Sequence, residues 1–199
     1  MPKNQKIIFG IIGAVILIGV ASYFLFRNTS PAEPEVVGNA KPGWELYESN
    51  QNRFVIQYPM AFNDADVQPI KDIFRVYFPP ATTTTNLANA TVYVDVTSND
   101  CSGWKSLESN TKTDILPAEL TVDGKAYTLR SVKEQPAGHE GYTYLYFTSA
   151  NNRCYAVALL LLSRAMDTYT PATKPAAYLS ESFEKTFLEI VQTFKISSL

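Results

Sequence analysis

The one histidine of the chain, His139, stands beside Glu140 in the sequence Gly-His-Glu-Gly. An imidazole next to a carboxylate is a pairing used in general-base catalysis, so these two residues are the candidates for a hydrolase of cell-envelope substrates. Nucleophilic catalysis also needs a positioned Ser or Cys, and no Gly-x-Ser-x-Gly motif marks one. The flanking glycines indicate a loop. We therefore favour a solvated or structural His139, and predict a protein that is not an enzyme.

The chain has only two cysteines, Cys101 and Cys154. Both fall in the part that we place outside the membrane, where thiols are commonly oxidised, so we predict a disulfide between them. Two buried free thiols are the alternative. Their separation does not fit the Cys-x-x-Cys spacing of catalytic redox pairs. Two cysteines and one histidine also cannot supply a four-ligand zinc site, so we predict no metal and no cofactor.

Three tyrosines, Tyr142, Tyr144 and Tyr146, alternate along one stretch of the chain. Alternation places side chains on one face of a strand, and tyrosine rings can stack on a carbohydrate or peptide ligand. Tyrosine is also frequent in strands, so a half-buried packing face is the simpler interpretation. These residues are nevertheless the candidate ligand contacts.

The charge balance argues against nucleic acid as a partner. Seventeen Lys and Arg against nineteen Asp and Glu give a net charge of −2, without the positive excess that neutralises phosphates. No glycine-rich phosphate loop is present either, so nucleotide-dependent chemistry has no support. Asn28 and Asn89 begin glycosylation sequons, which we interpret as accidental.

An apolar run over residues 7–26 is long enough to cross a bilayer as a helix. Lys3 and Lys6 precede it, so the positive-inside rule places residues 1–6 in the cytoplasm and the C-terminal part outside the cell membrane. We predict a single-pass signal anchor, with a cleaved signal peptide ending near Gly19-Val20-Ala21 as the alternative. Residues 27–43 are rich in proline, which is typical of a linker.

Residues 44–199 have the length of one domain, rich in strands. Alternating apolar residues predict strands at 53–58, 73–78, 91–97, 118–122, 125–132, 142–148 and 154–162. Asp123-Gly124 predicts a tight hairpin, residues 82–86 a loop, and the run at 157–162 a central strand covered on both faces. A helical stripe is formed by Phe183, Phe187, Ile190, Val191 and Phe194, with Ser180 as its N-cap and Glu181 paired to Lys185. The fold class is α+β, with an antiparallel sheet of about six or more strands and packing helices.

The two ends of this domain resemble a known family. Trp44-Glu45-Leu46-Tyr47 followed by Phe54-Val55-Ile56-Gln57-Tyr58-Pro59 is similar to the start of PsbP-like domains, and residues 187–196 resemble their final helix running into a last strand. That resemblance implies an α/β/α sandwich and a role in binding or assembly, and it transfers no catalytic residue. The middle of the chain, around Asn152-Arg153-Cys154-Tyr155, resembles small membrane-anchored extracytoplasmic proteins of unknown function from uncultivated bacteria.

The sequence therefore predicts a membrane-anchored, extracytoplasmic and non-catalytic module that binds a protein or an envelope component. Two alternatives stay open: the hydrolase using His139 and nearby carboxylates, and a purely structural subunit of an envelope complex. A structural subunit would present a large exposed apolar patch rather than a pocket.

Overall fold

The computed structural model describes residues 40–62, 74–79, 85–98, 100–109, 113–135 and 138–197. The predicted membrane helix at 7–26 and most of the linker lie outside these residues. Within the described ranges, no helix has both the length and the apolar character needed to span a bilayer. Residues 38–199 form one compact unit, which contains all of the elements below.

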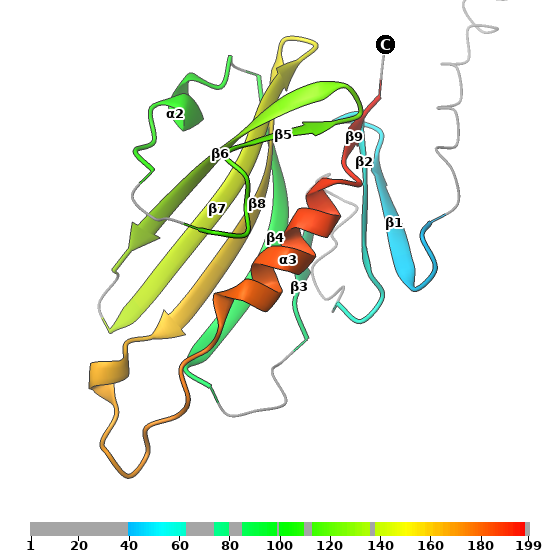
Figure 1. The fold of residues 1–199 in the computed structure, drawn as a ribbon. Helices are drawn as coiled ribbons and strands as arrows, with labels where there is room; N and C mark the ends of the chain where they lie inside the picture. The colour runs from blue at the N-terminus through cyan, green and yellow to red at the C-terminus, as the bar shows by residue number, and fades with distance from the viewer. Residues whose placement is uncertain are drawn as a thin grey trace, which may run out of the picture. The chain divides into compact units, whose positions relative to one another are not determined.

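A six-stranded antiparallel sheet forms the main part of this unit, in the order β3-β4-β8-β7-β6-β5 (Figure 1). Its strands are β3 (Arg75–Tyr77), β4 (Leu87–Thr97), β5 (Glu119–Val122), β6 (Lys125–Glu134), β7 (His139–Ala150) and β8 (Arg153–Arg164). The six predicted strands that enter it are confirmed in place, although Ile73 lies outside the described residues. The antiparallel α+β class predicted from the sequence is confirmed.

Two tight turns fix the register of the hairpins. Asp123 and Gly124 both have positive φ, 50° and 71°, as the predicted β5–β6 turn requires. Asn151 and Asn152 do the same between β7 and β8, at 52° and 56°. That turn has two residues instead of the five expected, and the pairing continues at the other end of the hairpin as far as His139 with Arg164, so β7 and β8 are longer than predicted at both ends.

A second, three-stranded sheet has the order β1-β2-β9. It combines β1 (Trp44–Ser49) and β2 (Phe54–Pro59) with β9 (Lys195–Ile196). Phe54 pairs with Ile196 and Val55 with Lys195, so the beginning and end of the domain meet here. The strand predicted over 53–58 is confirmed, but it belongs to this small sheet and not to the large one. The Arg153 guanidinium connects the two sheets by donating to the Gln51 carbonyl at 3.0 Å.

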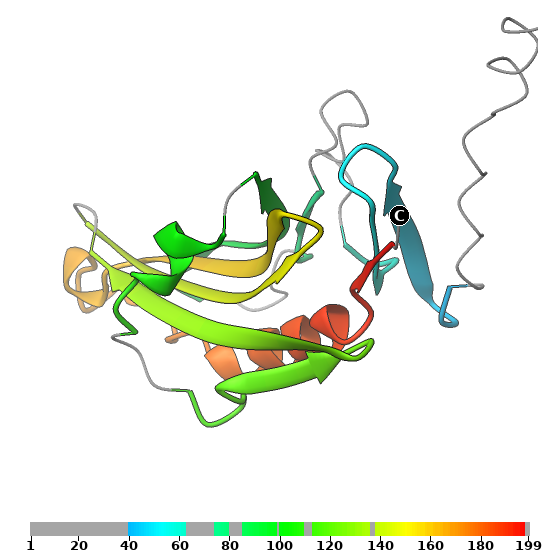
Figure 2. The same ribbon diagram turned by 90° about the horizontal axis from the view of Figure 1, so that it is seen from above.

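Helix α3 (Ser180–Val191) supplies the centre of the core. Phe187, Ile190, Val191 and Phe194 from the predicted stripe are fully buried, while Phe183 is half-buried. The predicted ion pair between Glu181 and Lys185 is present. The predicted N-cap is wrong: the helix begins at Ser180, and Leu179 precedes it without a side-chain cap. In Figure 2 the large sheet curves, so that β5 and β6 lie on one side of α3 and β8 on the other.

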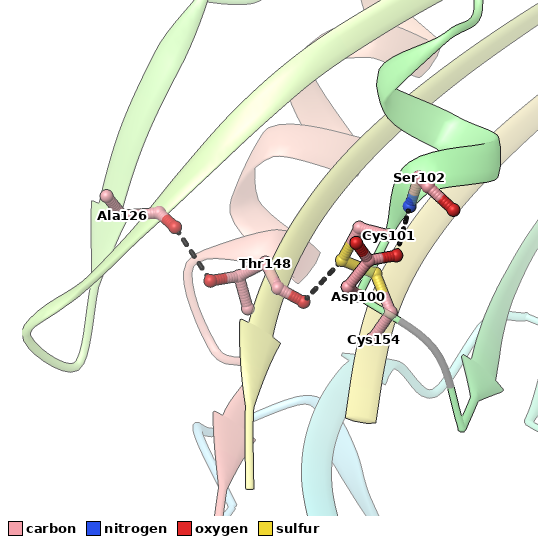
Figure 3. Close-up of a disulfide and its surroundings, with 6 residues drawn as sticks. All are labelled: Asp100, Cys101, Ser102, Ala126, Thr148 and Cys154. Carbon is pink, nitrogen blue, oxygen red and sulfur yellow. Dashed lines mark hydrogen bonds between the residues drawn. A yellow bond between two sulfur atoms is a disulfide. The ribbon is translucent and has the colours of Figure 1, made fainter. Parts of the chain in front are cut away.

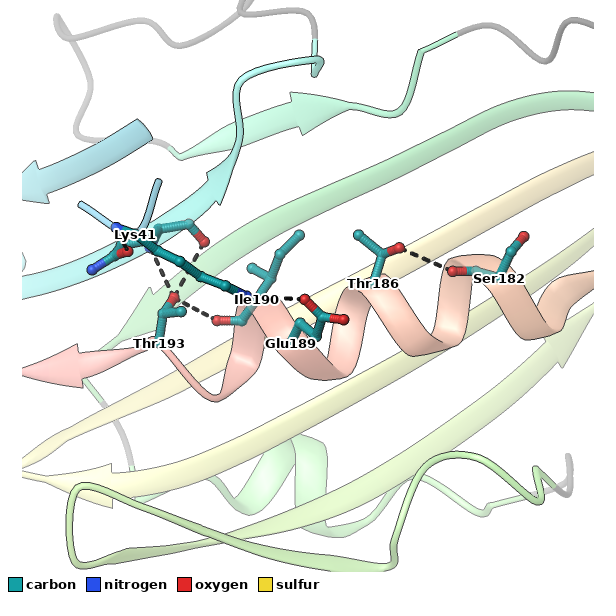
Figure 4. Close-up of polar contacts among 7 residues, drawn as sticks. Lys41, Ser182, Thr186, Glu189, Ile190 and Thr193 are labelled. Atoms are coloured by element: carbon teal, nitrogen blue, oxygen red, sulfur yellow. Dashed lines mark hydrogen bonds and ion pairs between the residues drawn. The ribbon is translucent and has the colours of Figure 1, made fainter. Parts of the chain in front are cut away.

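The end of α3 is tied to the small sheet by polar contacts (Figure 4). The Thr193 hydroxyl donates to the Ile190 carbonyl at 2.7 Å and accepts from the Gln57 backbone N–H at 2.8 Å. Lys41 and Glu189 form an ion pair at 3.1 Å across the same junction. Inside the helix, the Thr186 hydroxyl donates to the Ser182 carbonyl at 3.0 Å. These contacts fix α3 against β2 at one end and leave its first turns to meet other elements.

The outer face of the large sheet carries a smaller apolar cluster. Leu145, Phe147, Cys154, Ala156 and Ala158 are buried there beneath Cys101 and Trp104. The covering segment includes α2 (Ser102–Lys105), which has only four residues. The sequence predicts helices on both faces of the sheet. In the described part of the chain, α3 covers one face, and the other face carries only the four-residue α2. The far end of β8, at Leu160 and Leu162, is only half-buried.

The predicted disulfide between Cys101 and Cys154 is present, with the two Cα atoms 5.2 Å apart (Figure 3). Cys101 has a φ of 66°, and the Ser102 backbone N–H that follows donates to the Asp100 carboxylate at 3.1 Å. The Sγ atom of Cys101 lies 3.4 Å from the Thr148 carbonyl oxygen, while the Thr148 hydroxyl donates to the Ala126 carbonyl. The disulfide thus joins the α2 segment to the start of β8.

Candidate functional site

A pocket of about 500 Å³ opens between the first turns of α3 and the start of β7. Its walls come from both elements, from the 113–115 segment, and from residues 166–178, which include the short 3₁₀ helix η2 (Met166–Thr168). Two chemical types dominate the lining. The carboxylates are Asp114, Glu140, Glu181 and Glu184, and the tyrosines are Tyr142, Tyr144 and Tyr178.

Glu184 is the most buried of the four carboxylates, with 4% of its surface exposed. Its Oε2 atom accepts a 2.5 Å hydrogen bond from the Thr113 hydroxyl, and the Tyr144 hydroxyl is a second partner. The Thr113 Oγ1 atom also accepts from the backbone N–H groups of Ile115 and Leu116, both at 3.2 Å. Glu184 thus holds the 113–116 turn against α3. Both of these partners are neutral hydroxyls.

The other acidic groups are more accessible. Glu140 pairs with Lys133 at 3.6 Å, and Glu181 pairs with Lys185 one helical turn away. The Lys185 partner holds the pKa of Glu181 below its usual value. Asp114 is exposed at the rim. Two of the four carboxylates therefore have lysine partners outside the pocket lining.

The tyrosines divide into two groups. Tyr142 and Tyr144 line the pocket, and Lys133 lies over the Tyr142 ring at 5.1 Å. Burial, and then the charge of Glu184, raises the pKa of Tyr144. Burial also raises the pKa of Tyr178, which lines the opposite wall. Tyr146 serves the core instead, because its hydroxyl donates to the Pro117 carbonyl at 2.7 Å and its ring stacks on Phe187.

All three predicted tyrosines share one face of β7, as the alternation indicates, but only two of them reach the pocket. Ligand binding by Tyr142 and Tyr144 stays a prediction. The sequence reasoning missed Thr113, Tyr178 and Glu184. One signal for Glu184 was readable: it lies three residues before Phe187 and seven before Val191, so it belongs to the buried stripe of the helix.

Asn86 builds the wall that carries Tyr178. Its side-chain amide donates to the Arg164 carbonyl at 3.0 Å, and its side-chain oxygen accepts from the Tyr178 backbone N–H at 3.0 Å. Its backbone N–H donates to the Ala176 carbonyl. The predicted loop at 82–86 thus ends in a buried asparagine that fixes residues 176–178 to the end of β8. Residues 82–84 lie outside the described part.

His139 is not in a loop as predicted, but is the first residue of β7. The long register with β8 draws it into the sheet, where it pairs with Arg164. Neighbouring residues of a strand point to opposite faces, so the His139 ring is directed away from the face that carries Tyr142 and Tyr144. A second hollow of about 600 Å³ touches His139, Glu140 and η2. The one hydroxyl in its described lining, Thr168 Oγ1, donates to the Ala165 carbonyl.

Three segments have the Ser-x-x-Lys spacing that some hydrolases use, residues 102–105, 109–112 and 182–185. Among the described residues, the serines of all three and the lysines of the first and last are exposed, and none of them lines the pocket. Lys185 is engaged by Glu181, and the Ser102 backbone N–H by Asp100. In the described residues, this spacing brings no serine and lysine together in a pocket.

No protein-family model and no curated protein matches the sequence. Among solved structures, a protein from Bacteroides thetaiotaomicron is 12% identical over 77% of this chain, with a TM-score of 0.45. This chain covers 48% of it, about half its length.

Two further structures are similar over most of both chains. The Ran-binding protein Mog1p from Saccharomyces cerevisiae is 13% identical, covering 77% of this chain and 95% of its own, with a TM-score of 0.43. The cyanobacterial PsbP from Synechocystis is 11% identical, covering 83% and 98%, with a TM-score of 0.33. The PsbP-like assignment stays a prediction.

Proposed function

We propose that this protein is a membrane-anchored module outside the cell membrane that binds a ligand or partner in the pocket between α3 and β7. The observation that carries the proposal is the pocket itself, with Tyr142, Tyr144, Tyr178 and the buried Glu184 converging on one space. Ligand sites are concave and combine apolar or aromatic walls with a few placed polar groups. The apolar run at 7–26 supports the anchored location.

The geometry favours binding over hydrolysis. His139 and Glu140, the pair on which a hydrolase would depend, are neighbours on one strand and point to opposite faces. Glu140 instead faces the pocket and pairs with Lys133. Both residues touch the second hollow, but only Glu140 also lines the pocket between α3 and β7, so His139 has no place in that pocket. Substitution of His139 by alanine is therefore expected to leave ligand binding intact.

Photo-crosslinking in the producing cells tests the binding function. A benzophenone amino acid replaces Ala177, an exposed residue of the pocket lining, in the full-length chain, and Ser106 at the end of α2 is the matched exposed control. A discrete adduct is expected from position 177, absent from position 106 and lost when Glu184→Leu changes the pocket. Equal labelling at both positions, or none at 177, overturns the proposal.

The location is tested separately by reporter fusions at the C-terminus. Alkaline phosphatase, which needs an oxidising compartment, is expected to be active there, and a cytoplasmic reporter inactive. Activity of the cytoplasmic reporter alone would contradict an external domain.

A further inference from the structure

We infer that the pocket takes an organic cation, the ammonium or guanidinium group of a lysine or arginine side chain or of a free amine. This inference rests on the proposed binding function and names its ligand class. It starts from the charges that line the pocket: four carboxylates contribute to the wall, and no Lys or Arg is among the described lining residues.

The decisive group is Glu184. It is almost completely buried, yet its described partners, Thr113 and Tyr144, are neutral hydroxyls. Glu140 and Glu181, by contrast, are the carboxylates that the nearby Lys133 and Lys185 engage. A carboxylate withdrawn from water is costly unless a cation compensates it. Among the described lining residues, then, the buried Glu184 carboxylate has no lysine or arginine beside it, and a cationic ligand would supply that partner.

The walls around Glu184 suit an organic cation. Tyr142, Tyr144 and Tyr178 line the pocket, and the faces of such rings attract ammonium and guanidinium groups. Among the described residues, no group of three His, Cys, Asp or Glu side chains is arranged to hold a metal ion. A volume of about 500 Å³ falls in the range of small-ligand sites and admits an alkyl chain behind the charged head.

Nuclear magnetic resonance titration of the full-length chain in detergent micelles tests this inference. The probes are acetyl-Gly-Lys-Gly-amide, the same peptide acetylated on the lysine amine, and cadaverine as a free amine. We expect saturable shifts of the Thr113, Ala177 and Tyr178 amide signals with the lysine peptide, and binding weakened about tenfold or more by acetylation. Tighter binding of cadaverine than of the peptide points to a small amine, and the reverse to a peptide segment.

Two pairs of variants assign the effect to Glu184 and to charge. Glu184→Gln keeps the shape and a hydrogen-bonding oxygen, and is expected to weaken the lysine peptide about tenfold or more. Glu189→Gln makes the same change on the exposed side of α3, outside the pocket, and is expected to have no effect. Ala177→Lys places a tethered cation at the mouth of the pocket and is expected to abolish probe binding. Ala177→Gln adds a side chain without a charge and is expected to retain probe binding. These last variants remove no buried group, so the test survives if Glu184→Gln unfolds.

The results separate this inference from the proposed function. Equal affinity for the lysine and acetyl-lysine peptides, or no binding of any cationic probe, would refute a cationic ligand. If the crosslink at position 177 still depends on the pocket, the proposed binding function is retained. Loss of the crosslink together with all probe binding overturns both.

Discussion

Replacing Cys101 and Cys154 by alanine is expected to lower the free energy of unfolding by about 4 kcal/mol. The disulfide joins residues 53 positions apart. In the chain-entropy model, closing a loop of that length removes about 14 cal/mol/K from the unfolded chain, or about 4 kcal/mol at 25 °C. For a domain of this size, the same loss corresponds to a drop in Tm of about 8–16 °C.

Urea unfolding of the full-length chain in detergent, followed by circular dichroism, measures this effect. Each single variant, Cys101→Ala or Cys154→Ala, is expected to lose nearly as much as the double variant, because either substitution breaks the same bond. The slope with urea is expected to rise, since the uncrosslinked unfolded chain exposes more surface. A loss below about 1 kcal/mol, or single losses that add up to the double, would refute a disulfide that acts by restraining the unfolded chain.

Three further substitutions or conditions probe the core. Phe187→Ala is expected to cost about 3–5 kcal/mol in urea unfolding, because its fully buried ring packs beneath Tyr146, whereas the exposed Lys185→Ala should cost under about 1 kcal/mol. Tyr155→Phe is expected to change stability by less than about 1 kcal/mol, because among the described residues Arg153 is the only polar partner of its buried hydroxyl and that contact falls outside direct hydrogen-bond geometry; a larger loss would contradict this. Burial raises the pKa of Tyr127 above its usual 10.0, because the folded protein disfavours the phenolate. The unfolded chain therefore ionises this group first, so the free energy of unfolding is unaffected below pH 10 and falls as the pH rises above it. A pH titration followed by tyrosinate absorbance measures this. In Tyr127→Phe, one tyrosine fewer than in the unchanged chain should ionise above pH 10.

Local periodicity was enough to predict the faces of single elements. Val92 and Val94 point into the core as their alternation requires, and Phe187, Ile190 and Val191 form the buried stripe of α3. Such patterns indicate which side of a helix or strand is buried, whichever element it packs against. The Asp123-Gly124 turn was predictable for the same reason, because its backbone conformation depends on those two residues.

Contacts between distant segments were not predictable in this way. Nothing local indicates that Phe54 pairs with Ile196, which moves β2 out of the large sheet. His139 was assigned to a loop because the length of β7 depends on its register with β8 and not on its own residues. Thr113 is held in the pocket by Glu184, 71 positions away, and Tyr178 by Asn86, 92 positions away. The residues of the site could therefore be brought together only once the fold was known.

The pairing of β2 with β9 also sets a time order on biosynthesis. Phe54 lies against Phe194, and the edge of β2 is completed by Lys195 and Ile196, about 140 residues after it emerges. Throughout the interval the nascent chain carries an uncovered apolar strand edge, the feature that recruits chaperones and seeds aggregation. A ribosome that stops before residue 194 therefore releases a chain that lacks both the Phe194 contact and the strand that completes β2, and such truncated products are expected to be degraded as they form.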